Sequence, residues 1–132
     1  MKAKRALFWA RIAIYVVVLV VLAVFALRYD ILRLPAAGCS PLRDFQPGQR
    51  LLLDRWSKAE QGDAVLFEMG DELLLGRVFP FPPDTRPAAG PASEDSLWIV
   101  ADAPDCPAKD SRALGPIPRA AVRARVAAGL PW

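Results

Sequence analysis

Ser40 is the residue whose surroundings first suggest chemistry in this chain of 132 residues. It follows Cys39 and stands seven residues before the Pro47-Gly48 pair. A serine hydroxyl is a poor nucleophile unless a neighbouring group takes its proton. The chain contains no histidine, which excludes a Ser-His-Asp triad, a Cys-His dyad and any imidazole metal site. We expect neither a metal nor a cofactor.

Few other side chains could accept a proton from Ser40. Lys58 lies in a polar turn and Lys109 in a charged box, so both are expected to be solvated and ion-paired, which keeps a lysine charged. Asp102 and Asp105 could orient a group or accept a proton weakly. An ordinary loop serine at position 40 remains an open interpretation.

The elements that position these residues begin with a long apolar run. Residues Ile12–Leu27 carry no charge, and starting the run at Ala6 gives 22 residues, about 33 Å of helix and enough to cross a bilayer. Three basic residues and no acid precede it, so the positive-inside tendency places the N-terminus in the cytoplasm. We therefore expect residues 1–34 to be a basic start, a transmembrane anchor and a juxtamembrane turn, and residues 35–132 to be an exported domain.

Two targeting signals compete with a retained anchor. A cleaved signal peptide would have a shorter apolar core and small residues directly after it, whereas Arg28, Tyr29 and Asp30 follow this one. The segment Ala36–Cys39 (AAGC) looks like a lipoprotein cleavage box, but a dozen residues separate it from the apolar core. A retained anchor is therefore favoured.

Composition and charge narrow the class of the exported part. All prolines and glycines follow residue 34, which marks a boundary at Pro35. Four basic residues precede residue 12, so the rest of the chain holds 13 of the 17 Lys and Arg against all 14 Asp and Glu. No basic stripe with interleaved aromatic residues is visible, so nucleic acid is not an expected partner.

The exported part has the pattern of a small all-β domain. Strands are expected over residues 50–55, 64–68, 72–79, 97–101 and 122–127. Gly62-Asp63 and Gly70-Asp71 between apolar runs are typical of hairpin turns, and the proline-rich segment 81–95 is expected to be a loop. The expected fold class is mainly β, with a single transmembrane helix before the β domain.

The order of motifs along the chain resembles the type I signal peptidases, membrane-bound serine proteases that cut signal peptides from exported proteins. The most specific piece is DSR, Asp110–Arg112, followed by Gly115-Pro116; the next is the GDAVLF segment that begins at Gly62. The resemblance covers nearly the whole chain. It implies a signal-peptidase-like domain and a bacterial inner-membrane protein whose C-terminal domain is periplasmic.

The resemblance implies a nucleophile but no base. The family's serine stands seven residues before the proline of a Pro-Gly turn, which corresponds to Ser40, although Pro41 follows it where the family has methionine. The family's lysine base immediately precedes an Arg-Val pair in the third strand. Here that pair is Arg77-Val78, so Gly76 stands at the position of the missing lysine.

We call the segment Asp110–Arg112 the late box and expect it to be structural. Asp110 and Arg112, on either side of Ser111, would fix the late loop through charge-assisted hydrogen bonds near the site. Arg77 is interpreted as a strand arginine that braces neighbouring turns. Such residues would persist in an inactive relative.

Cys39 and Cys106 are the only cysteines. Both lie outside the membrane on this topology, where oxidising conditions favour pairing. The resemblance places one cysteine beside the segment that holds Ser40 and the other beside the late box. It also implies that these two segments meet at one cleft, so a disulfide is expected. Two thiols that never meet are the alternative.

Four aromatic residues leave two interpretations open. They are Trp56, Phe67, Phe79 and Phe81. Aromatic residues at strand spacing are mostly core, but the resemblance also allows an apolar surface near the bilayer.

Two functions follow. The first is a catalytically impaired single-pass membrane protein that acts as a binding module or as a subunit of a membrane complex. The alternative is an active serine endopeptidase that removes signal peptides, with Ser40 as nucleophile and a non-standard base. The glycine at position 76 favours the first. The expected partners are the bilayer and signal peptides or other membrane subunits.

Overall fold

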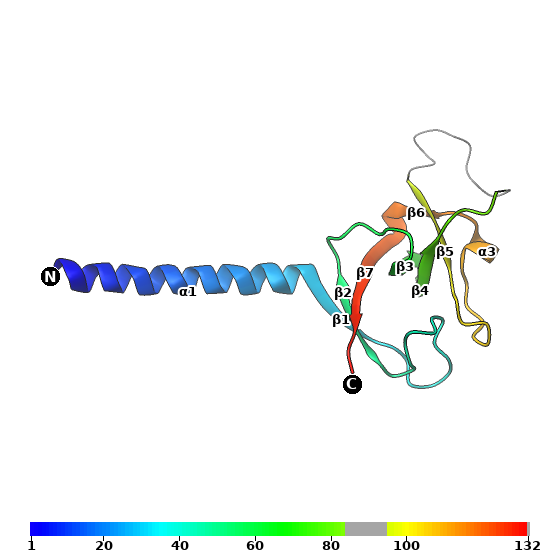
Figure 1. Ribbon diagram of the computed structural model, residues 1–132, viewed down its shortest axis with the longest axis horizontal. Coiled ribbons are helices and arrows are strands. Elements are labelled where there is room, and N and C mark those ends of the chain that lie inside the picture. Colours follow the sequence, from blue (N-terminus) through cyan, green and yellow to red (C-terminus); the bar gives the residue numbers. More distant parts are fainter. Residues whose placement is uncertain (84–94, 132) are drawn as a thin grey trace.

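The computed structural model of the protein describes residues 1–83 and 95–131. Helix α1, Lys2–Arg28, projects from one side of a β domain (Figure 1). Within the described residues the strands form one antiparallel sheet in the order β1-β2-β7-β3-β4-β5-β6. The expected class, mainly β with one N-terminal apolar helix, is confirmed. By length and composition α1 could cross a membrane.

The strands lie close to where the apolar runs predicted them. They are β1 Tyr29–Arg33, β2 Arg50–Asp54, β3 Ala64–Met69, β4 Glu72–Phe79, β5 Ser96–Val100, β6 Ile117–Pro118 and β7 Val122–Gly129. A short helix α3, Ser111–Leu114, and a 3-10 turn η1, Arg119–Ala121, complete the described elements. Strand β1 occupies the segment for which we expected a juxtamembrane turn. The loop expected over 81–95 lies mostly outside the described residues.

The connections between strands differ from the pattern of simple hairpins. Gly70 adopts φ +62°, a left-handed conformation that glycine tolerates, and it joins β3 to β4 in the expected hairpin. The turn at Gly62-Asp63 does not join a hairpin, because β7 lies between β2 and β3. Arg125 of β7 is opposite Asp54 of β2 and also opposite Val65 of β3.

The core has two clusters of buried side chains, and β3 contributes to both. Leu66 belongs to the first cluster and Phe67 to the second, because successive side chains of a strand point to opposite faces. The first cluster also holds Leu42 from the loop between β1 and β2. Phe67 is therefore core, whereas Trp56 is exposed.

A polar contact joins α1 to the sheet. The carboxylate of Asp54, at the end of β2, is 1% exposed and accepts hydrogen bonds from the Arg28 guanidinium at 2.8 and 3.2 Å. It also accepts hydrogen bonds from the Ser57 hydroxyl at 2.6 Å and from the amides of Trp56 and Ser57. The hydrogen bonds from Arg28 and Ser57 outweigh the effect of burial and hold the pKa of Asp54 well below its ordinary value.

We expect Asp54→Asn to lower the free energy of unfolding by about 2 kcal/mol at neutral pH, because several hydrogen bonds to a charged acceptor are weakened. A depressed pKa means that this stabilisation is present above the ordinary pKa of 3.8 and is lost as the pH falls through the lower folded-state value. Denaturation of the full chain in detergent micelles at pH 7 and pH 3 measures the difference. If the variant loses the same unfolding free energy relative to the wild type at both pH values, the role of the ionised carboxylate is contradicted.

Candidate functional site

Ser40 lies in the loop between β1 and β2 and is half-buried. Its hydroxyl donates a hydrogen bond to the Leu42 carbonyl at 2.9 Å and lies 3.4 Å from the Leu42 amide nitrogen. The fully buried side chain of Leu42 fixes this turn in the first cluster. The hydroxyl therefore has its partners within its own turn.

The Ser40 loop is fastened to the segment after β5. Cys39 and Cys106 form a disulfide with their Cα atoms 5.5 Å apart, so the expected pairing is confirmed. The Ala103 amide donates to the Pro41 carbonyl at 3.1 Å. The Arg43 amide donates to a carboxylate oxygen of Asp102 at 2.8 Å. These contacts bring the region of Ser40 and the region before the late box together.

Arg77 of β4 braces the same region. Its guanidinium donates to the Gly62 carbonyl at 2.7 Å and to the Asp102 carboxylate at 3.3 Å, and it forms an ion pair with Asp44. Because Asp102 also accepts from the Arg43 amide, one carboxylate connects the strand to the Ser40 loop.

Gly76, where the resemblance places a missing base, is covered by a side chain from the neighbouring strand. A Cβ atom added to Gly76 would lie 2.5 Å from Cγ2 of Ile99, which is fully buried in the second cluster. The neighbouring Leu75 packs in the first cluster, on the side of the Ser40 loop. A side chain at position 76 would therefore point into the opposite cluster, where a lysine would have to displace Ile99.

We expect Gly76→Ala to lower the free energy of unfolding by about 1–3 kcal/mol, the usual cost of overpacking a core. In an Ile99→Ala background the added methyl group has room, so the same change should cost less. A double-mutant cycle by chemical denaturation in detergent measures the coupling. Strict additivity of the two changes would contradict the contact.

Among the described residues, no lysine forms a hydrogen bond with Ser40. Lys109 is 60% exposed and forms an ion pair with Glu72 at 2.9 Å, as expected. Lys58 is exposed but, within the described part of the chain, forms no ion pair, so that part of the expectation is wrong. The two remaining lysines, Lys2 and Lys4, belong to the first turn of α1. Among the described residues, the hydrogen bonds of the Ser40 hydroxyl involve Leu42 only.

The late box forms a buried polar cluster at the end of β5. Asp110 is 2% exposed, and its carboxylate accepts from the Ala101 amide at 3.0 Å and from the Arg112 amide at 2.9 Å, which caps α3. The Ser111 hydroxyl accepts a hydrogen bond from the Ile99 amide at 2.8 Å. Burial acts to raise the pKa of Asp110, but hydrogen bonds from Arg112 and Ala101 outweigh it and the pKa is lowered.

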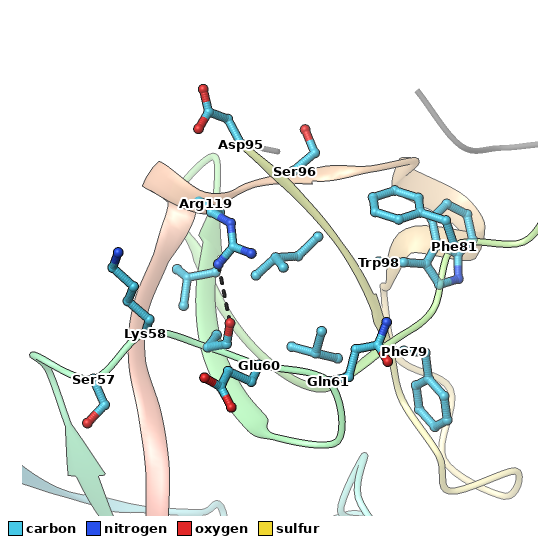
Figure 2. A pocket seen from close by; sticks show the side chains of 14 residues that line it. Ser57, Lys58, Glu60, Gln61, Phe79, Phe81, Asp95, Ser96, Trp98 and Arg119 are labelled. Atoms are coloured by element: carbon cyan, nitrogen blue, oxygen red, sulfur yellow. Dashed lines mark hydrogen bonds between the residues drawn. The ribbon is translucent and has the colours of Figure 1, made fainter. Parts of the chain in front are cut away.

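A groove of about 770 Å³ lies elsewhere on the domain (Figure 2). Its walls come from residues 57–61, β5 and η1, and Phe81 and Trp98 lie side by side with ring centroids 6.1 Å apart. Arg119 donates to the Ala59 carbonyl at 3.2 Å, and both residues line the groove. Neither Ser40 nor Gly76 lines this groove. Its walls come from segments with no shared motif, so no local pattern in the sequence marks this groove.

Comparison with protein-family models and with curated proteins finds no match to this chain. The fold and the site therefore define a class of protein only: one apolar helix that could span a membrane, followed by an antiparallel β domain with one disulfide. A relation to signal peptidases rests on the order of the sequence motifs.

Proposed function

We propose that the protein is a single-pass protein of the bacterial inner membrane whose periplasmic domain is a non-catalytic relative of type I signal peptidases. It binds an extended peptide segment, such as a signal peptide, without cutting it. The motifs from Ser40 to Gly115-Pro116 and the apolar helix before them support this relation. The N-terminus lies in the cytoplasm, on the basic side of α1.

One observation carries the loss of catalysis. The place of the lysine base holds Gly76, and the space in front of it is occupied by Ile99. A serine without general base assistance loses about 10²–10⁴ in rate, and more where the two groups act as a unit. The exposed amine of Lys109 forms an ion pair with Glu72 at 2.9 Å instead of contacting Ser40.

The edge of β4 supports binding of an extended segment. Strand β4 runs from Glu72 to Phe79, but β5 pairs with it only over Arg77–Phe79. Among the described strands, the half that begins at Glu72 has β3 on one side and no partner on the other. Unpaired edges accept a further strand through main-chain hydrogen bonds, with side-chain contacts adding specificity.

A cleavage assay tests the absence of catalysis. We expect neither the wild-type protein nor Ser40→Ala, both solubilised in detergent, to cut a model preprotein that an active signal peptidase cuts under the same conditions. The Ser40→Ala variant should unfold within about 1 kcal/mol of the wild type, because one local hydrogen bond is lost. Cleavage by the wild type that disappears in Ser40→Ala would instead establish the active endopeptidase.

A cross-linking assay tests the binding site. A photoreactive residue at Leu73 of β4 should cross-link a synthetic signal peptide added to the full chain in a bilayer nanodisc. Leu114 of α3 is the control, because its side chain is also exposed but lies on a helix, which offers no strand edge. Equal cross-linking from both positions, or none from Leu73, would contradict binding at the β4 edge.

A further inference from the structure

The basic residues at the start of α1 have no counter-ion within the chain. Lys2, Lys4, Arg5 and Arg11 are exposed, and among the described residues none of them forms an ion pair. The first acidic residue of the sequence is Asp30, beyond the other end of the helix. In Figure 1 this end of α1 lies away from the β domain, so no carboxylate of the domain is near it. A molecule that binds here therefore carries negative charge.

The length of α1 places Arg11 below the edge of the hydrocarbon when the helix crosses a bilayer. The uncharged stretch Ile12–Leu27 is about 24 Å long at 1.5 Å per residue, whereas the hydrocarbon is about 30 Å thick. One of the two flanking arginines must lie inside it. Arg28 is bound to Asp54 and β1 follows it directly, so the outer end of α1 is held at the surface. Arg11 then lies about 4–6 Å inside the inner edge.

The Arg11 side chain reaches the headgroup layer from that depth. Side chains of a helix tilt toward its N-terminus, which is the cytoplasmic direction in the proposed orientation. The stem of Arg11 can therefore lie along lipid while its guanidinium contacts the lipid phosphates. Arginine binds a phosphate group through two parallel N–H···O hydrogen bonds, so the contact has a defined geometry.

Lys4 shares one face of α1 with Arg11. The two residues are seven positions apart, close to two helical turns, so they differ by only about 20° around the helix axis. Leu7 is a neighbour of both, three positions after Lys4 and four before Arg11. We call Lys4, Leu7 and Arg11 the basic face. Arg5 points about 160° away from Leu7, on the far side of the helix.

The level of the basic face favours a lipid as the source of the negative charge. About twenty residues back from Leu27 reaches Phe8, so Leu7 lies at the inner edge of the hydrocarbon, beside the lipid phosphates. A second copy inserted in the same direction brings no acidic residue to this level. A zwitterionic lipid adds a cationic group that the basic residues repel. An anionic lipid instead has a net negative charge that each nearby Lys or Arg attracts.

We propose that the basic face of α1 is a binding site for an anionic phospholipid, with the Arg11 guanidinium and the Lys4 ammonium on the phosphate of one headgroup. This inference rests on the proposed insertion of α1 in a membrane and is independent of peptide binding by the β domain. It adds that α1 selects a lipid at one face, instead of attracting anionic lipid equally on all sides.

Photo-cross-linking in the full chain tests the proposal. A photoreactive residue replaces Leu7, whose side chain is 59% exposed, and the protein is placed in nanodiscs of phosphatidylcholine and phosphatidylglycerol, with one or the other lipid radiolabelled. We expect phosphatidylglycerol to be captured in excess of its share of the lipid. Arg11→Gln should lower this preference about fivefold, the effect of one basic residue near anionic lipid, and Lys4→Gln should lower it in the same direction.

Arg5→Gln is the matched control. It removes the same charge from the far side of α1, and glutamine has nearly the helix propensity of arginine, so the helix is retained in both variants. The preference for phosphatidylglycerol should change by less than about twofold.

The outcomes separate the lipid site from the anchor. Equal losses in Arg11→Gln and Arg5→Gln would mean that the basic residues attract anionic lipid diffusely, which overturns the site. Capture of both lipids in proportion to their abundance by the wild type would also overturn it, while the anchor stands. If neither lipid is captured from position 7, α1 is not inserted and the proposed membrane anchoring fails.

Discussion

Replacing Cys39 and Cys106 by serine is expected to lower the free energy of unfolding by about 4 kcal/mol. The bond closes a loop with a sequence separation of 67, and cross-linking a loop of that length restricts the unfolded chain by this amount in the chain-entropy model. A loss of this size is about a quarter or more of the total stability of a typical domain. Chemical denaturation of the full chain in detergent micelles measures it.

Reduction provides the control for this experiment. Dithiothreitol should bring the wild type to the stability of the double serine variant and should leave that variant unchanged. The Ala103 to Pro41 and Arg43 to Asp102 hydrogen bonds remain in both. A loss below about 1 kcal/mol would mean that such contacts hold the Ser40 loop without the covalent bond.

Asp110→Ala is expected to cost about 3 kcal/mol of unfolding free energy. The change removes the cap of α3, worth about 1 kcal/mol, and leaves the buried Ala101 amide without its acceptor, which costs about 1–3 kcal/mol. Thermal unfolding followed by circular dichroism of the β domain measures the effect.

Arg112→Ala is the matched control for Asp110→Ala. The Arg112 side chain is largely exposed, so water can replace much of its ion pair with Asp110, and the expected loss is about 1 kcal/mol. If both variants lose equal stability, the guanidinium and not the capping carboxylate holds the late box.

The strands were predictable because their signals are local. Apolar runs bounded by Gly and Pro placed β2 to β5 and β7 within one or two residues, and the Gly70-Asp71 turn identified the β3–β4 hairpin. Strand β1 was missed because its residues are mostly exposed and directly follow a helix. Its pairing with β2 depends on a partner some twenty residues away, which no local pattern reports.

The resemblance names residues for the candidate site, but the sequence does not give their geometry. The resemblance predicts a missing base at Gly76, whereas the contact of that position with Ile99 depends on the pairing of β4 with β5. In the sequence Asp54 ends an apolar run, and nothing near it marks it as buried. Its burial depends on the Arg28 contact, which joins residues 26 positions apart. Long-range pairing is the information that composition and spacing lack.

The position of β7 in the middle of the sheet has a consequence for biosynthesis. Strand β2 pairs with β7, which follows roughly seventy residues later in the chain, and β3 pairs with the same strand. While the chain is being synthesised, these two segments have emerged long before the partner that separates them. The edges of β2 and β3 that pair with β7 are then open to solvent or to chaperones. The sheet can be completed only after β7 has been made.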